Sequence, residues 1–322
     1  MDPALPFALP QMAGGLFLSD GGLETTLVFL EGVALPHFAA FVLLADEAGR
    51  ERLRRYYRPY LELAASTPGA GFVLETPTWR ASADWGLLLG HDAATLAAVN
   101  IAAADLVRGL RDAWHSRIEG GIVLSGIIGP RGDGYVVDRI SSAADAQAYH
   151  RPQAQALKDG GVDMLAAVTM THLDEAVGVV RAARDVGLPV SVSFTVETDG
   201  RLPSGMTLRE AIERLDVDTP PDYFGINCAH PLHFETVLGR GDAWTTRIRS
   251  VRANASTLSH AELDAATELD IGDVAGLGDC YRRLRGPLAQ LNVLGGCCGT
   301  DARHLRAIRD AWVGQGLPLL TP

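Results

Sequence analysis

Residues 291–301 read LNVLGGCCGTD, a short β-rich run that ends in a cluster of glycines around two neighbouring cysteines, Cys297 and Cys298. It is the last of eight such runs. Between the runs lie long stretches whose apolar residues recur every three or four positions, as they do in amphipathic helices. The β-rich runs occupy residues 16–19, 71–75, 121–126, 162–168, 189–194, 222–227, 247–253 and 291–296.

Strand and helix alternating eight times predict an α/β protein, a single-domain (β/α)₈ TIM barrel. The clearest helical stretches are residues 46–66, 91–114 and 173–187. A doubly wound open sheet is the alternative, but the first run leads into DGGLET rather than the GxGxxG turn of a dinucleotide-binding sheet. We expect the barrel to span residues 14–322, after a proline-rich N-terminal arm at residues 1–13.

The composition is that of a globular protein, with 47% hydrophobic and 21% charged residues among 322. A net charge of −11 disfavours binding to nucleic acid or to anionic membranes. The N-terminus lacks a signal-peptide pattern, and no run of 18 apolar residues occurs. We therefore expect a cytoplasmic protein with small-molecule partners, and a homo-oligomer is compatible with the sequence.

The four cysteines are the most informative residues. In a reducing compartment, a metal site or a catalytic thiol is commoner than a structural disulfide. Cys228 directly follows the sixth β-rich run, and Cys297 and Cys298 follow the eighth. Because the carboxyl ends of all barrel strands meet at one rim, we expect these three sulfurs to converge. Cys280 lies in a helix-like stretch and is expected in the core.

Neighbouring residues on a regular strand point to opposite faces, so Cys297 and Cys298 face one ion only if the backbone turns. We expect Gly295, Gly296 and Gly299 to provide that turn, because glycine adopts positive φ at little steric cost.

Three thiolates form a soft ligand set that suits Zn²⁺ and leaves the fourth tetrahedral position open. Three thiolates and one Zn²⁺ have a total charge of −1. A zinc centre with this charge is a poor generator of hydroxide from water, but it is suited to binding a substrate thiol and removing its proton. The pattern thus indicates alkyl transfer to sulfur. A structural zinc that recruits His230 or His233 as its fourth ligand, and three buried apolar cysteines, remain alternatives.

The motifs NCAHP (227–231), GGCCGT (295–300) and DGGLET (20–25) resemble those of the zinc-dependent homocysteine S-methyltransferases, a family that includes betaine-homocysteine and S-methylmethionine-homocysteine methyltransferases. The resemblance runs from about residue 14 to residue 312. It implies a (β/α)₈ barrel, Zn²⁺ held by Cys228, Cys297 and Cys298, and no catalytic residue beyond the zinc-activated thiol. The implied donor is small and activated, of the S-methylmethionine, betaine or S-adenosylmethionine type, and the acceptor is homocysteine or a related thiol acid.

Motif positions and chemistry together suggest a set of substrate-binding residues. Trp79, Trp85 and Tyr135 offer aromatic faces on which a cationic donor can stack. The predicted substrate-binding residues are Asp20, Glu24, Thr76, Trp79, Arg80, Asn227 and Asn254.

Two departures from the family pattern bear on the acceptor. Val168 stands where the family usually has a Glu associated with the substrate's amino group, and Arg80 stands where Tyr or Gln is common. We hypothesise an acceptor thiol that is richer in carboxylate than homocysteine or lacks a free ammonium group. A non-catalytic zinc- or thiol-binding barrel and a zinc-dependent hydrolase or lyase on the same fold are the rival functions.

Overall fold

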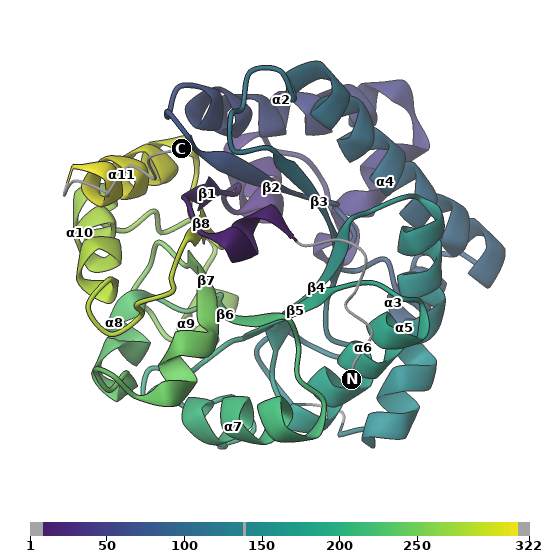
Figure 1. Cartoon of the computed structure of the whole chain (residues 1–322). Coiled ribbons are helices and arrows are strands. Elements are labelled where there is room, and N and C mark those ends of the chain that lie inside the picture. Colours follow the sequence, from purple (N-terminus) through teal and green to yellow (C-terminus); the bar gives the residue numbers. More distant parts are fainter. Residues whose placement is uncertain (1–8, 138–139, 315–322) are drawn as a thin grey trace.

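A computed structural model describes residues 9–137 and 140–314 of the chain. Eight parallel strands form a closed barrel in sequence order, and helices surround it (Figure 1). The prediction of a (β/α)₈ barrel is confirmed, and each expected β-rich run overlaps one strand, with β3 and β4 extending two residues further than predicted. The strands are β1 (Phe17–Leu18), β2 (Gly71–Glu75), β3 (Ile122–Ile128), β4 (Met164–Met170), β5 (Val190–Phe194), β6 (Tyr223–Asn227), β7 (Ile248–Ala253) and β8 (Val293–Gly296).

The long helices pack around the outside of the barrel (Figure 1). Acidic or hydroxyl side chains cap the first turn of every long helix except α6; Asp92, for example, accepts a hydrogen bond from the backbone N–H of Thr95 at the start of α4 (2.8 Å). Between β6 and β7 the chain forms only short helical turns. The α-helices are α1 (Leu23–Thr25), α2 (Glu47–Ala65), α3 (Ala83–Leu88), α4 (Ala93–Trp114), α5 (Ala143–Asp159), α6 (Leu173–Asp185), α7 (Leu208–Asp218), α8 (Pro231–Phe234), α9 (His260–Asp264), α10 (Val274–Leu284) and α11 (Ala302–Val313).

Strand β1 closes the barrel although it is only two residues long. Phe17 pairs with Gly71 of β2 on one side and with Val293 of β8 on the other. Helices cover the outer face of the strands, and side chains fill the interior of the barrel. The strands are therefore buried on both faces, which explains their nearly continuous apolar runs. The closure brings β8 and its two cysteines next to the first loop of the chain, residues 19–22.

Residues 9–13 seal the amino end of the barrel. Leu9 packs against the first residues of the strands, among them Phe17 and Tyr223. The fully buried side chain of Gln11 donates a hydrogen bond to the sulfur of Met164 (3.3 Å), and the Gln11 carbonyl accepts one from the Asn292 side chain (2.8 Å). Residues 1–8 lie outside the described residues, so the boundary of an N-terminal arm at residue 13 stays a prediction.

Helix α4 is the single helix, within residues 9–137 and 140–314, that is long and apolar enough to cross a membrane. The core helices of globular proteins pass the same test. Here Leu96, Ala103 and Val107 are buried against the rest of the protein. Asn100 is buried on the same helix and donates a hydrogen bond to the carbonyl of Ala81 (2.9 Å). The helix thus packs as part of the barrel's outer layer.

Gly22 allows the first loop to approach the cysteine turn closely. Its N–H donates a hydrogen bond to the Thr300 carbonyl (3.0 Å). A Cβ atom at this position would lie 2.5 Å from the carbonyl oxygen of Cys297 and 3.1 Å from its carbonyl carbon. Any side chain here forces the two backbones apart.

We expect Gly22→Ala to lower the free energy of unfolding by about 1–3 kcal/mol, because the added methyl overlaps backbone that is held by the barrel. The matched control is Gly109→Ala on the exposed face of α4, where an added Cβ meets nothing within 4 Å. That change should be neutral or stabilise by up to about 1 kcal/mol. Urea denaturation measures both, and a wild-type midpoint for Gly22→Ala would contradict the close approach.

Candidate metal centre and substrate cavity

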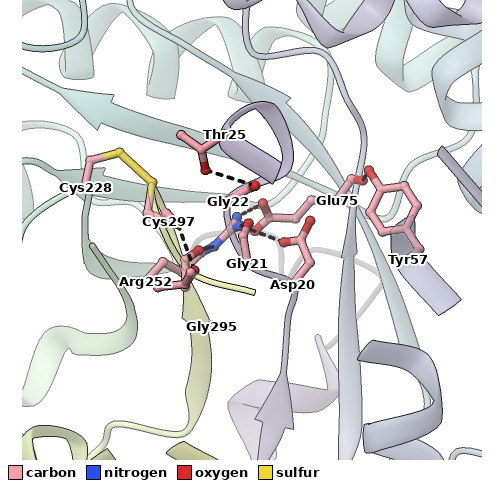
Figure 2. Close-up of polar contacts among 12 residues, drawn as sticks. Asp20, Gly21, Gly22, Thr25, Tyr57, Glu75, Cys228, Arg252, Gly295 and Cys297 are labelled. Atoms are coloured by element: carbon pink, nitrogen blue, oxygen red, sulfur yellow. Dashed lines mark hydrogen bonds and ion pairs between the residues drawn. A yellow bond between two sulfur atoms is a disulfide. The ribbon is translucent and has the colours of Figure 1, made fainter. Parts of the chain in front are cut away.

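The three predicted cysteines converge at the carboxyl ends of the strands. Cys228 follows β6, and Cys297 and Cys298 follow β8; their Sγ atoms all lie within 4.8 Å of one another. The structure joins Cys228 and Cys297 by a disulfide (Figure 2), and the Sγ of Cys298 lies 3.9 Å from that of Cys228. The predicted convergence of the three sulfurs is confirmed, and the same convergence that suits a metal also brings two thiols to bonding distance.

The sulfur positions fit a metal ion once the disulfide is reduced. Tetrahedral zinc with Zn–S bonds of about 2.3 Å places its sulfur ligands about 3.8 Å apart. The distance between Cys228 and Cys298 already has this value, 3.9 Å. In the described part of the chain, no other residue belongs to this group of metal-binding side chains.

The two histidines that were considered as a fourth ligand have other partners. The Nδ1 atom of His230 accepts a hydrogen bond from the Leu232 N–H (3.2 Å), and His233 Nε2 donates to the Thr257 carbonyl (2.9 Å). Burial, together with His233 and Arg283, lowers the pKa of His230 to about 4. A structural zinc completed by either histidine is not supported.

The backbone of Cys228 is in the left-handed region, with φ of 54°. For a residue with a side chain this costs on the order of 1–2 kcal/mol. Three groups hold the Cys228 carbonyl in this orientation: the side-chain amide of Asn254 (3.0 Å), the hydroxyl of Thr195 (3.2 Å) and Nε2 of His260 (2.7 Å). Asn254, predicted to bind substrate, therefore lies behind the metal centre and orients a cysteine.

The turn that carries Cys297 and Cys298 is held by hydrogen bonds to β7 and to α1. Cys297 donates its N–H to the Ala253 carbonyl (2.8 Å), and its own carbonyl accepts from the Thr300 N–H (3.1 Å). The expectation that three glycines supply positive φ is wrong for two of them, since only Gly299 has it (79°). Gly295 and Gly296 end strand β8. A side chain at either position would overlap the side chain of Ser19 or of Thr300, which occupies the adjacent space.

A cavity of about 530 Å³ opens beside the sulfurs, a size that suits small-molecule ligands. Of the described residues, seven carboxyl side chains and two guanidinium groups line it. Every predicted substrate-binding residue except Asn254 is among the lining residues. The charged ones are Asp20, Glu24, Glu75, Asp133, Asp264, Glu268, Asp270, Arg80 and Arg252.

Arg252 at the end of β7 is the centre of a buried ionic cluster (Figure 2). Its guanidinium pairs with Asp20 (2.6 Å) and with Glu75, and its Nε donates to the Gly296 carbonyl (3.1 Å). Asp20 was predicted to contact substrate, but its carboxylate is occupied by this arginine. Sequence reasoning missed Arg252; its place as the penultimate residue of a strand, at the rim that carries the cysteines, was the available signal.

Glu24 lines the same cavity without such a partner. Within the described residues, no side chain forms a hydrogen bond or ion pair with its carboxylate. Burial, opposed by its own backbone N–H, raises the pKa of Glu24 to about 7. The neighbouring carboxylate of Asp20 adds to the increase, and Arg252 and Arg80 oppose it.

The loop after β2 contributes Thr76, Trp79 and Arg80 to the cavity. Thr76 Oγ1 accepts a hydrogen bond from the Ile127 N–H (2.9 Å), which ties β2 to β3. The guanidinium carbon of Arg80 lies 4.0 Å from the centre of the Trp79 ring and 3.7 Å from that of Trp85. Trp85 thus stacks on an arginine of the protein and is not among the cavity-lining residues.

The β3–β4 side of the cavity is apolar. Val168, in the position where the family pattern has Glu, is buried with Ile127 and Ala166, and Trp79 packs against them. The adjacent Thr169 has a positive φ of 60°, which the side chain of Asn227 supports by bonding its N–H (2.7 Å) and its hydroxyl (2.8 Å).

Tyr135, in the loop after β3, reaches the metal centre. Its hydroxyl donates a hydrogen bond to Cys298 Sγ (3.4 Å), and its ring stacks on His260 with centroids 4.1 Å apart. His260 in turn contacts Glu197 through Nδ1 (3.0 Å). The loop is anchored at Arg131, whose N–H donates to buried Glu175 (2.7 Å).

Comparison with known proteins agrees with this geometry. A family model described as homocysteine S-methyltransferase matches residues 17–312. The chain is 26% identical to the homocysteine S-methyltransferase of Escherichia coli (strain K12), over 91% of this chain and 94% of that protein. It is 25% identical to betaine–homocysteine S-methyltransferase 1 of Rattus norvegicus, over 92% of this chain and 72% of that protein.

Solved structures of the Escherichia coli homocysteine methyltransferase MmuM share the fold. The oxidised form superposes with a TM-score of 0.73 at 23% identity, and the metallated form with 0.70 at 24%. Both alignments cover 94% of this chain and 99% of the other. With a matching family model over nearly all of the barrel, this chain belongs to the homocysteine S-methyltransferase family.

Proposed function

We propose that the protein is a zinc-dependent S-methyltransferase that moves a methyl group from a small activated donor to a thiol held at Cys228, Cys297 and Cys298. The observation that carries the proposal is the convergence of these three sulfurs at one edge of a substrate-sized cavity. The relatives whose names specify betaine or S-methylmethionine as donor and homocysteine as acceptor support this reaction class.

Zinc bound by three thiolates would bind the acceptor thiol, favour loss of its proton and leave an electron-rich sulfur. The protein's own residues do the rest. Three donors on the Cys228 carbonyl keep its sulfur facing the other two. The Tyr135 hydroxyl donates a hydrogen bond to Cys298.

The rival functions fit less well. A hydrolase or lyase needs a metal that keeps its positive charge and a base positioned for water, whereas this ligand set is all sulfur. A non-catalytic binding barrel needs no access for a second ligand beside the thiol, yet the cavity has room for both substrates. We place the protein in the cytoplasm, where reducing conditions keep the three thiols available.

For the acceptor we propose a thiol acid without a free ammonium group. The wall formed by Val168, Ile127 and Trp79 offers no charge to pair with a cation. Asp20, another carboxylate that lines the cavity, is paired with Arg252. A buried ammonium against this wall loses hydration without compensation.

Cys298→Ala should lose both zinc and thioether formation, because it removes one of three metal ligands. Cys280→Ala is the matched control, since Cys280 is buried in α10 and bonds Arg283 rather than the metal centre. Elemental analysis gives the zinc content, and X-ray absorption should show sulfur neighbours at about 2.3 Å in the wild type and in the control. Full zinc occupancy in Cys298→Ala would refute the ligand assignment.

The acceptor preference is testable by calorimetric titration of the reduced, zinc-loaded protein. We expect 4-mercaptobutanoate to bind about tenfold more tightly than homocysteine, because only homocysteine brings an ammonium to the apolar wall. Val168→Glu should shift the preference towards homocysteine, and Val217→Glu, an exposed site on α7, should leave it unchanged. Tightest binding of homocysteine by the wild type would reject the acceptor assignment.

A further inference from the structure

Four of the carboxylates that line the cavity are not exposed, and one of them, Glu24, has a role that the fold does not explain. The other three have partners in the protein: buried Asp20 and Glu75 pair with Arg252, and half-buried Asp133 accepts hydrogen bonds from its own loop. Glu24 has no side-chain partner among the described residues and lines the cavity. A carboxylate taken from water without a partner is costly, and such a group is retained where a ligand supplies the partner.

Glu24 lies in the segment that packs against the cysteine turn. Its neighbours along the chain bind the cysteine turn directly: Gly22 donates to the Thr300 carbonyl (3.0 Å), and Thr25 Oγ1 accepts from the Gly299 N–H (3.1 Å). Glu24 and Cys298 both line the cavity. The fold therefore holds Glu24 next to the metal-binding turn.

The remainder of the lining suits a methylated cation. Phe29 and Phe38 line the cavity, and so do Trp79 and Tyr135, whose rings also stack on Arg80 and His260. Aromatic faces together with one carboxylate are the groups that bind quaternary ammonium and sulfonium compounds, whose charge is spread over methyl groups that form no strong hydrogen bonds. An ordinary ammonium, in contrast, requires several hydrogen-bond acceptors.

We propose that Glu24 is the counter-ion of the donor's onium group, the sulfonium or quaternary ammonium centre that carries the methyl group. This inference rests on the proposed methyl transfer. In that step the acceptor thiol's proton goes to solvent and its sulfur forms a bond to the methyl carbon. The bond between that carbon and the donor's S⁺ or N⁺ breaks, and the electron pair stays on the leaving sulfide or amine, which becomes neutral.

Because the donor's charge disappears during transfer, the ion pair with Glu24 is strongest before the reaction. The carboxylate thus contributes to donor binding more than to the rate of the chemical step, and it releases the neutral product. Replacing it should raise the KM for the donor and leave kcat little changed.

The test compares pairs of ligands with the same shape and different charge. Glycine betaine is paired with 3,3-dimethylbutanoate, and S-methylmethionine with 2-amino-5-methylhexanoate; binding to the zinc-loaded protein is measured by calorimetry. For at least one pair we expect the wild type to bind the onium member about tenfold or more tightly, and Glu24→Gln to lose this preference. Asp264→Asn, an exposed acid at the same cavity, should change it less than about twofold.

The controls separate the possible failures. Glu24→Gln removes a buried charge without changing shape, so its melting temperature should not fall below that of the wild type at pH 8. An onium preference that is the same in Glu24→Gln as in the wild type overturns the inference. An effect confined to homocysteine, and absent for 4-mercaptobutanoate and for the onium ligands, also overturns it, because Glu24 would then bind the acceptor's ammonium. Loss of onium binding in Glu24→Gln without thioether formation by the wild type refutes the methyl transfer and leaves the counter-ion role standing.

Discussion

The metal centre depends on the left-handed backbone of Cys228. A regular continuation of β6 would send this side chain elsewhere and leave the pair on β8 without a third ligand. The strained conformation persists because Asn254, Thr195 and His260 all bind the same carbonyl oxygen. These three residues come from different elements, so the three hydrogen bonds to the Cys228 carbonyl can form only after the barrel has closed. Folding and the formation of the ligand set are therefore linked.

Much of this was predictable from the sequence. The alternation of β-rich and amphipathic stretches predicted the barrel, because the residue patterns of strands and helices can be read from short segments of the chain. The barrel in turn predicted that Cys228 meets Cys297 and Cys298, since strand ends share one rim. The family resemblance pointed to the cavity residues Thr76 and Asn227.

What the sequence did not predict are features that depend on pairing across the barrel. Arg252 is one of two arginines in β7, and only the folded structure shows that it pairs with Asp20 and Glu75. The position of Asn254 behind Cys228 and the stacking of Trp85 on Arg80 likewise follow from side-chain packing rather than from spacing. The sequence showed Glu24 in a motif, but not that it lacks a partner.

The seal at the amino end has a kinetic consequence. Residues 9–13 fill that end of the barrel, so the sulfurs are approached from the opposite rim, where the cavity lies. Under the proposed methyl transfer, both substrates use this one entrance, and the thiol must reach the cysteines. A donor bound between the thiol and the entrance would block its passage, so we expect the thiol to bind first and the demethylated donor to leave before the thioether. A compulsory-order ternary complex is the kinetic scheme that this architecture favours.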